Sequence, residues 1–123
     1  MLNMVFLALR LISLVMIPAF CCAHDMPEKF YQDKWCNEYG GITEYRLQDG
    51  AKVDCLTDTH AVEFDFALKW AEAIGQALFY SAVTGKRAGI VLILEDDEDV
   101  RHLIRLRTTI LYNSLPIDVF EYF

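Results

Sequence analysis

The stretch AVEFDFALKWAEAIGQALFYSAVTGKRAGIVLILE, residues 61–95, indicates how this chain folds. It begins with alternation typical of a β-strand: one side carries Val62, Phe64 and Phe66, and the other carries Glu63 and Asp65. The apolar residues then recur at helical spacing until a glycine ends the pattern. GIVLILE follows as a continuous apolar run, which predicts a strand buried on both faces. The stretch therefore predicts a right-handed β-α-β crossover.

The flanking segments extend this unit to a small α/β domain. MPEKFYQDKWCNEYG, residues 26–40, predicts an amphipathic helix with a proline entry and a glycine exit. ITEYRLQ and AKVDCLT predict two strands joined by an Asp-Gly turn. Residues 96–113 predict a helix that opens with acids, and residues 117–123 predict a last strand. The expected order is α-β-β-β-α-β-α-β, with a small mixed sheet flanked by helices on both faces.

Residues 1–23 have the pattern of a secretory signal peptide. Arg10 precedes a short apolar run, Pro18 ends the run, and small residues lead to cleavage after Ala23. A membrane anchor is the alternative, but the run after Arg10 is shorter than the roughly 20 residues that a spanning helix needs. We therefore expect no stable membrane anchor, export to the periplasm or the extracellular space, and one domain over residues 24–123.

The charge and the cysteines constrain what the exported part does. The chain has a net charge of −7, and Arg10 is the only charged residue of the predicted signal, so the rest is more acidic still. An acidic surface disfavours loose electrostatic binding to nucleic acid or anionic lipid, yet it is compatible with a metal ion bridging carboxylates to phosphate. Cys36 and Cys55 remain after cleavage, and we expect a disulfide between them; two small buried thiols are the alternative.

Acidic residues gather on the second and third predicted strands. Asp54 lies on the second strand, and Glu63 and Asp65 point the same way from the third. Because the two strands are antiparallel neighbours, we expect the three carboxylates to converge on a hard-oxygen site of the kind that Mg²⁺ or Mn²⁺ prefers. Lys69, at the start of the next helix, would orient a water or stabilise developing charge. These residues form a candidate catalytic and metal site.

The following helix adds a Gln-x-x-x-Tyr pattern, because Gln76 and Tyr80 lie four residues apart on one helix face. With this pattern the chain resembles the PD-(D/E)XK nuclease superfamily, specifically the RecB-like branch. In that family an acid on one strand and a (D/E)-x-K on the next bind divalent metal and cut phosphodiesters, and the next helix often carries Q-x-x-x-Y. The resemblance covers roughly residues 28 to 95 and agrees with the family's α-β-β-β-α-β core.

The resemblance implies a restriction-endonuclease-like fold and a role for each matched residue. Asp54 takes the place of the first acid and Glu63 that of the second. Gln76 and Tyr80 would contact the substrate backbone, and Glu38 is the candidate for the acid that many members carry in the first helix.

One position departs from the pattern, since Asp65 stands where the family has its lysine. Some members carry that lysine on the following helix, and Lys69 is the corresponding residue here. Together with the predicted signal peptide, the resemblance then implies an exported nuclease-like enzyme that hydrolyses phosphodiester bonds with Mg²⁺ or Mn²⁺. Nucleic acid is the expected partner, and so small a domain favours a homodimer that grips a duplex. The alternative is a catalytically inactive binding or structural module in the cell envelope, favoured by the missing lysine and the acidic charge.

Simpler interpretations exist for each candidate. Alternation alone explains Glu63 and Asp65 as the solvated face of an amphipathic strand. Gln76 and Tyr80 would then be an ordinary half-buried helix pair. The acidic run at residues 95–99 suits a helix N-terminus better than a second metal site. His60 lies in the turn before the third strand and has only a weak claim to touch substrate.

Overall fold

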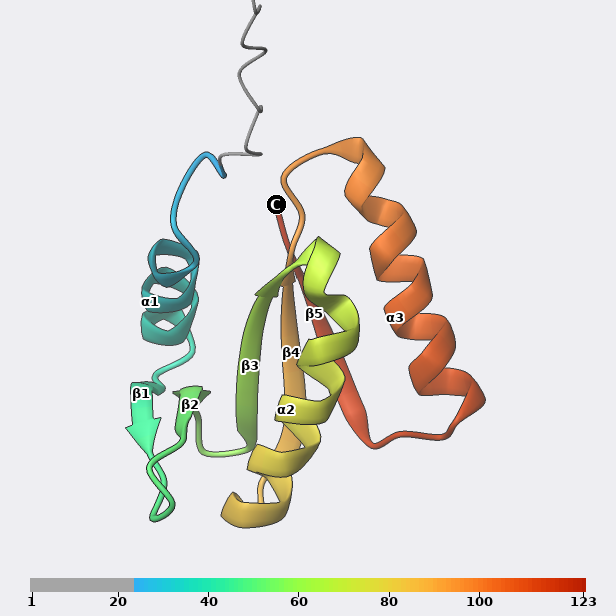
Figure 1. Cartoon of the computed structure of the whole chain (residues 1–123). Helices are drawn as coiled ribbons and strands as arrows, with labels where there is room; N and C mark the ends of the chain where they lie inside the picture. Colours follow the sequence, from blue (N-terminus) through green and yellow to red (C-terminus); the bar gives the residue numbers. More distant parts are fainter. Residues whose placement is uncertain (1–23) are drawn as a thin grey trace, which may run out of the picture.

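A computed structural model describes residues 24–123, which fold as an α/β domain with a five-stranded sheet and three helices (Figure 1). The predicted element order is confirmed. The elements are α1 (Glu28–Glu38), β1 (Ile42–Arg46), β2 (Lys52–Leu56), β3 (His60–Phe66), α2 (Trp70–Thr84), β4 (Arg87–Ile93), α3 (Val100–Tyr112) and β5 (Ile117–Tyr122). Short 3₁₀ turns, Ala67–Lys69 and Asp97–Asp99, lead into α2 and α3.

The predicted signal peptide, residues 1–23, lies outside the described residues. From residue 24 to the C-terminus, no helix combines the length and the apolar character that crossing a membrane requires.

The sheet is mixed and has the strand order β1-β2-β3-β4-β5. β1, β2 and β3 form an antiparallel meander, whereas β3, β4 and β5 run parallel to one another. The strand from the GIVLILE run, β4, lies between two parallel neighbours and is buried along its length after Arg87. This confirms the prediction that the run forms a strand buried on both faces.

Helices cover both faces of the sheet, as Figure 1 shows, with α1 apart from α2 and α3. On one face α1 packs on β3 and β4 through an aromatic core. On the other face α2 and α3 pack on β4 through aliphatic side chains. Ala73 and Ala77 are fully buried on α2, and their small size lets this helix approach the sheet closely.

Cys36 and Cys55 form the expected disulfide, so the alternative of two free thiols is wrong. The bond ties α1 to β2, and both residues are fully buried. A Cβ added at Gly41 would lie 2.5 Å from Cys55 Sγ and 2.8 Å from Cys36 Sγ. The glycine is therefore required for space, since the chain leaving α1 passes directly against the sulfur atoms.

Candidate functional site

The candidate site lies where β2 and β3 separate, between Asp54 and Phe64; we call this point the fork. The two strands pair at only two positions, Cys55 with Val62 and Leu56 with Ala61. Beyond these two pairs, the Asp54 side chain takes the place of a backbone hydrogen bond between the strands: its Oδ2 accepts the backbone N–H of Phe64 at 2.8 Å. The carboxylate is therefore fixed against the edge of β3 where the two strands part.

The other side of Asp54 is held by α1. The Gln32 amide, only 2% exposed, donates to the Asp54 backbone oxygen at 2.6 Å and to Glu44 Oε1 at 3.1 Å. Glu44 lies opposite Asp54 in β1 and has a φ of 53°, in the left-handed region that a non-glycine residue rarely adopts. Such a conformation costs on the order of 1 kcal/mol and persists only where its surroundings impose it. Contacts with α1, β1 and β3 together thus set the position of Asp54.

Glu63 and Asp65 lie on the α2 side of β3, because Val62 and Phe64 belong to the core on the α1 side. Each is only 4% exposed, so their interpretation as a solvated strand face is wrong. Within residues 24–123, Glu63 Oε2 and Asp65 Oδ2 are buried without a hydrogen-bond partner. Buried polar atoms normally have partners, and an orphaned carboxylate oxygen therefore marks a place for a proton or a cation.

The carboxyls of Asp54 and Glu63 lie close enough to shift each other's pKa. Burial, followed by the charge of Asp54, raises the pKa of Glu63 far above its ordinary value. Burial also raises the pKa of Asp54, against the hydrogen bond from the Phe64 N–H. For Asp65, burial and the nearby Glu28 raise the pKa to about 7, while Lys69 acts in the opposite direction.

Glu28, the first residue of α1, is a member of the cluster that sequence reasoning missed. Burial raises its pKa, followed by the charge of Asp54, while Lys69 lowers it. Its only sequence signal was an acid directly after Pro27, which a helix N-terminus explains equally well. The expected helix acid, Glu38, lies exposed at the opposite end of α1, about 15 Å along the helix axis from Glu28. The structure does not bring Glu38 to the cluster.

α2 and the turn before it supply the remaining candidates. Lys69 is exposed at the end of the 3₁₀ turn, close enough to Asp65 and Glu28 to act on both. Tyr80 is 7% exposed, and its Oη donates to Gln76 Oε1 at 3.2 Å. Burial and the charge of Glu63 raise the pKa of Tyr80 to about 12, so the phenol lies beside the acids and stays protonated.

The chemistry of the cluster suits a hard divalent cation. Carboxylates are the ligands that Mg²⁺ and Mn²⁺ prefer, and two of the oxygens are orphaned. Across residues 24–123, however, no three His, Cys, Asp or Glu side chains stand in an arrangement that holds a metal ion. Because the pKa of Glu63 is raised to about 10, a cation binding at neutral pH would have to displace its proton and draw the carboxylates together.

The remaining polar candidates serve the fold. His60 Nε2 bonds Asp118 Oδ2 at 2.7 Å, and Arg87 pairs with the same carboxylate, at the end of β3 opposite Asp65. In the acidic run, Asp96 Oδ1 accepts the N–H groups of Glu98 and Asp99 at 2.9 and 3.2 Å. This is the geometry of a helix cap.

Comparison with protein-family models, with curated proteins and with solved structures found no significant match. The fold and the site alone therefore define the class: a disulfide-linked mixed α/β domain with a buried acid cluster at the fork between β2 and β3.

Proposed function

We propose that this chain is a divalent-metal-dependent hydrolase of phosphodiester bonds. The observation that carries the proposal is the pair of buried, orphaned oxygens of Glu63 and Asp65 beside Asp54. Burying like charges together is costly, so a chain that only had to fold would gain by replacing them with apolar residues. A function that needs closely spaced carboxylates explains why the cluster is there.

Three acids of the cluster and the polar residues beside it have separate tasks in this proposal. Asp54, Glu63 and Asp65 would hold Mg²⁺ or Mn²⁺, which when bound lowers the pKa of water and neutralises phosphate charge. Lys69, exposed at the rim, orients the attacking water and stabilises the negative charge that develops on the phosphate. The Gln76 amide, positioned by Tyr80, contacts the substrate backbone.

A cleavage assay tests the proposal. The purified protein is incubated with labelled single-stranded and duplex DNA and RNA in Mg²⁺, Mn²⁺ or EDTA. We expect metal-dependent cleavage that disappears in Glu63→Gln and Asp54→Asn. Asp97→Asn, an exposed acid in the turn before α3, is the matched control and should cleave normally. Undiminished cleavage in either site variant would reject the assignment.

A second candidate is a binding module of the same fold without catalysis. The observation in its favour is Asp65, an acid where the family that the chain resembles has its lysine. Isothermal titration with Mn²⁺ separates the two candidates when it is combined with the cleavage assay. Mn²⁺ binding without cleavage, or a folded protein that binds no Mn²⁺, would favour the binding module.

A further inference from the structure

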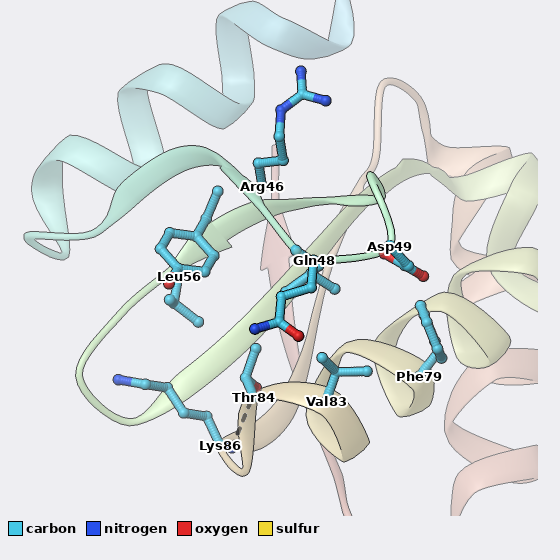
Figure 2. Close-up of a pocket in the computed structure, with 10 residues that line it drawn as sticks. Arg46, Gln48, Asp49, Leu56, Phe79, Val83, Thr84 and Lys86 are labelled. Carbon is cyan, nitrogen blue, oxygen red and sulfur yellow. Dashed lines mark hydrogen bonds between the residues drawn. The ribbon is translucent and has the colours of Figure 1, made fainter.

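A cleft of about 640 Å³ separates the β1–β2 hairpin from the C-terminal half of α2 (Figure 2). Its hairpin wall includes Tyr45 and Leu56, and its helix wall includes Phe79 and Val83. Tyr45 is 40% exposed and Phe79 44%, so both aromatic side chains remain accessible to a ligand. Two apolar walls that face each other across an open cleft suit a flat, apolar-faced ligand.

Polar groups lie between and beside these walls. Figure 2 shows Gln48 in the middle of the cleft, Lys86 at its lower edge, and Arg46 directed away from it. Lys86 Nζ donates to the backbone oxygens of Thr57 and Asp58 at 2.6 and 3.0 Å, which fixes its position and leaves its third N–H without a partner among residues 24–123. The cleft thus combines stacking surfaces, an amide with both a donor and an acceptor, one fixed cation, and the carboxylate of Asp49, which accepts the backbone N–H of Ala51 at 2.9 Å.

The cleft continues the candidate site along one helix face. Gln76, Phe79 and Val83 are spaced i, i+3 and i+7 on α2, with a rise of about 5.4 Å per turn. Tyr80, bonded to Gln76, packs with Leu47 and Val53 beneath the hairpin. A polymeric ligand held at Glu63 would therefore enter the cleft about one turn further along α2.

We propose that the cleft binds an unstacked nucleotide of a single-stranded nucleic acid, next to the phosphodiester held at the acid cluster. This inference rests on the proposed function and names its substrate class. The base stacks between Tyr45 and Phe79, the Gln48 amide bonds its edge, and Lys86 neutralises the adjoining phosphate. A duplex would first have to unpair and unstack a base to place it here, so it should bind more weakly than a single strand.

The net negative charge of the chain limits how strongly electrostatic attraction contributes to this binding. A protein with a net charge of −7 gains little from general attraction to phosphates, so stacking must supply most of the affinity. With a single fixed cation in the cleft, the logarithm of the binding constant for a single strand should fall with the logarithm of salt concentration with a slope of roughly −0.7.

Fluorescence anisotropy of labelled 12-nucleotide strands in EDTA tests the cleft without the metal. We expect single strands to bind at least tenfold more tightly than the matching duplex, and Phe79→Ala to weaken this binding roughly tenfold. Phe30→Ala on α1 is the matched control, since Phe30 is 45% exposed and outside the cleft. Tighter duplex binding, no single-strand binding, or equal effects of the two substitutions would overturn the inference.

The cleavage assay separates this inference from the proposed function. Metal-dependent cleavage that is lost in Glu63→Gln, together with unchanged single-strand affinity in Phe79→Ala, would reject the cleft and leave the hydrolase. Single-strand binding that depends on Phe79, with no cleavage in any metal, would support the cleft and reject the hydrolase.

Discussion

Asp54 Oδ2 accepts the backbone N–H of Phe64 at 2.8 Å, and this bond stands where a strand carbonyl would otherwise continue the sheet. The carboxylate therefore has a structural task at the fork as well as its place in the acid cluster. The two tasks can be separated because an amide keeps an acceptor oxygen and loses the charge.

Asp54→Ala should lower the free energy of unfolding by about 1–3 kcal/mol, because it leaves the buried Phe64 N–H without an acceptor. Asp54→Asn keeps an acceptor and should lose less. Urea denaturation monitored by tryptophan fluorescence measures both. Asp58→Ala, an exposed acid in the turn between β2 and β3, is the control and should change stability by less than about 0.5 kcal/mol. An alanine variant at Asp54 as stable as this control would contradict the role of the fork.

Gly41→Ala should lower the free energy of unfolding by about 1–3 kcal/mol, because the new methyl group would overlap the disulfide sulfurs. Gly75→Ala is the matched control: nothing lies within 4 Å of its added Cβ, and a helix-interior glycine gains about 0.5–1 kcal/mol on replacement by alanine. In a Cys36→Ala/Cys55→Ala background the penalty at Gly41 should shrink, which a double-mutant cycle measures. An equal penalty with and without the sulfurs would show that the crowding has another cause.

The metal-free protein should become less stable as pH rises from about 5 to 8. The pKa of Asp65 is raised to about 7 and that of Glu63 further, so the folded chain binds more protons than the unfolded chain in this range. Their contribution to stability is complete below the unfolded pKa values, near 4, and is lost as pH rises. Thermal unfolding in EDTA should therefore give a lower Tm at pH 8 than at pH 5. A double variant, Glu63→Gln/Asp65→Asn, should flatten the profile, and an unchanged slope would contradict the assignment.

The contribution of Asp118 to stability depends on pH in the opposite direction, and at lower pH. The hydrogen bonds from Arg87 and His60 lower its pKa to about 2, so its contribution is present above about pH 4 and is lost as pH falls further. Because the side chain is partly exposed, the effect is small. The stability maximum of the metal-free protein should consequently lie near pH 4–5.

The fold was predictable because its signals are local. The alternation of Val62 and Phe64 with Glu63, and the apolar run of β4, follow directly from which side chains a buried strand needs. The disulfide followed from two remaining cysteines in an expected oxidising compartment.

The site was less predictable because it depends on the relative placement of distant elements. The helix that brings Glu28 to the acids leaves Glu38 outside, and both are ordinary surface-type residues in the sequence. The burial of Asp65 depends on how closely α2 packs on the sheet. The left-handed conformation of Glu44, which accepts a hydrogen bond from Gln32, has no sequence signal at all.

Lys69→Met should separate metal binding from catalysis. Removing the amine relieves its repulsion of a cation held at Asp65, so Mn²⁺ should bind more tightly, while kcat for phosphodiester cleavage should fall roughly 10²–10³-fold. Lys34→Met, an exposed lysine on α1, is the control for the loss of one positive charge. If cleavage were equally fast in both variants, Lys69 would have no part in the reaction.

The central claim, that Asp54, Glu63 and Asp65 form a cation site kept closed by a proton, is tested most directly by isothermal titration with Mn²⁺. Run at pH 7 in two buffers of different ionisation enthalpy, it should give one binding event that releases a proton. In Glu63→Gln, which keeps the size of the protonated acid and should fold at least as stably, both binding and proton release should vanish. A folded wild-type protein that binds no Mn²⁺, or one whose binding is unchanged by Glu63→Gln, would contradict the claim.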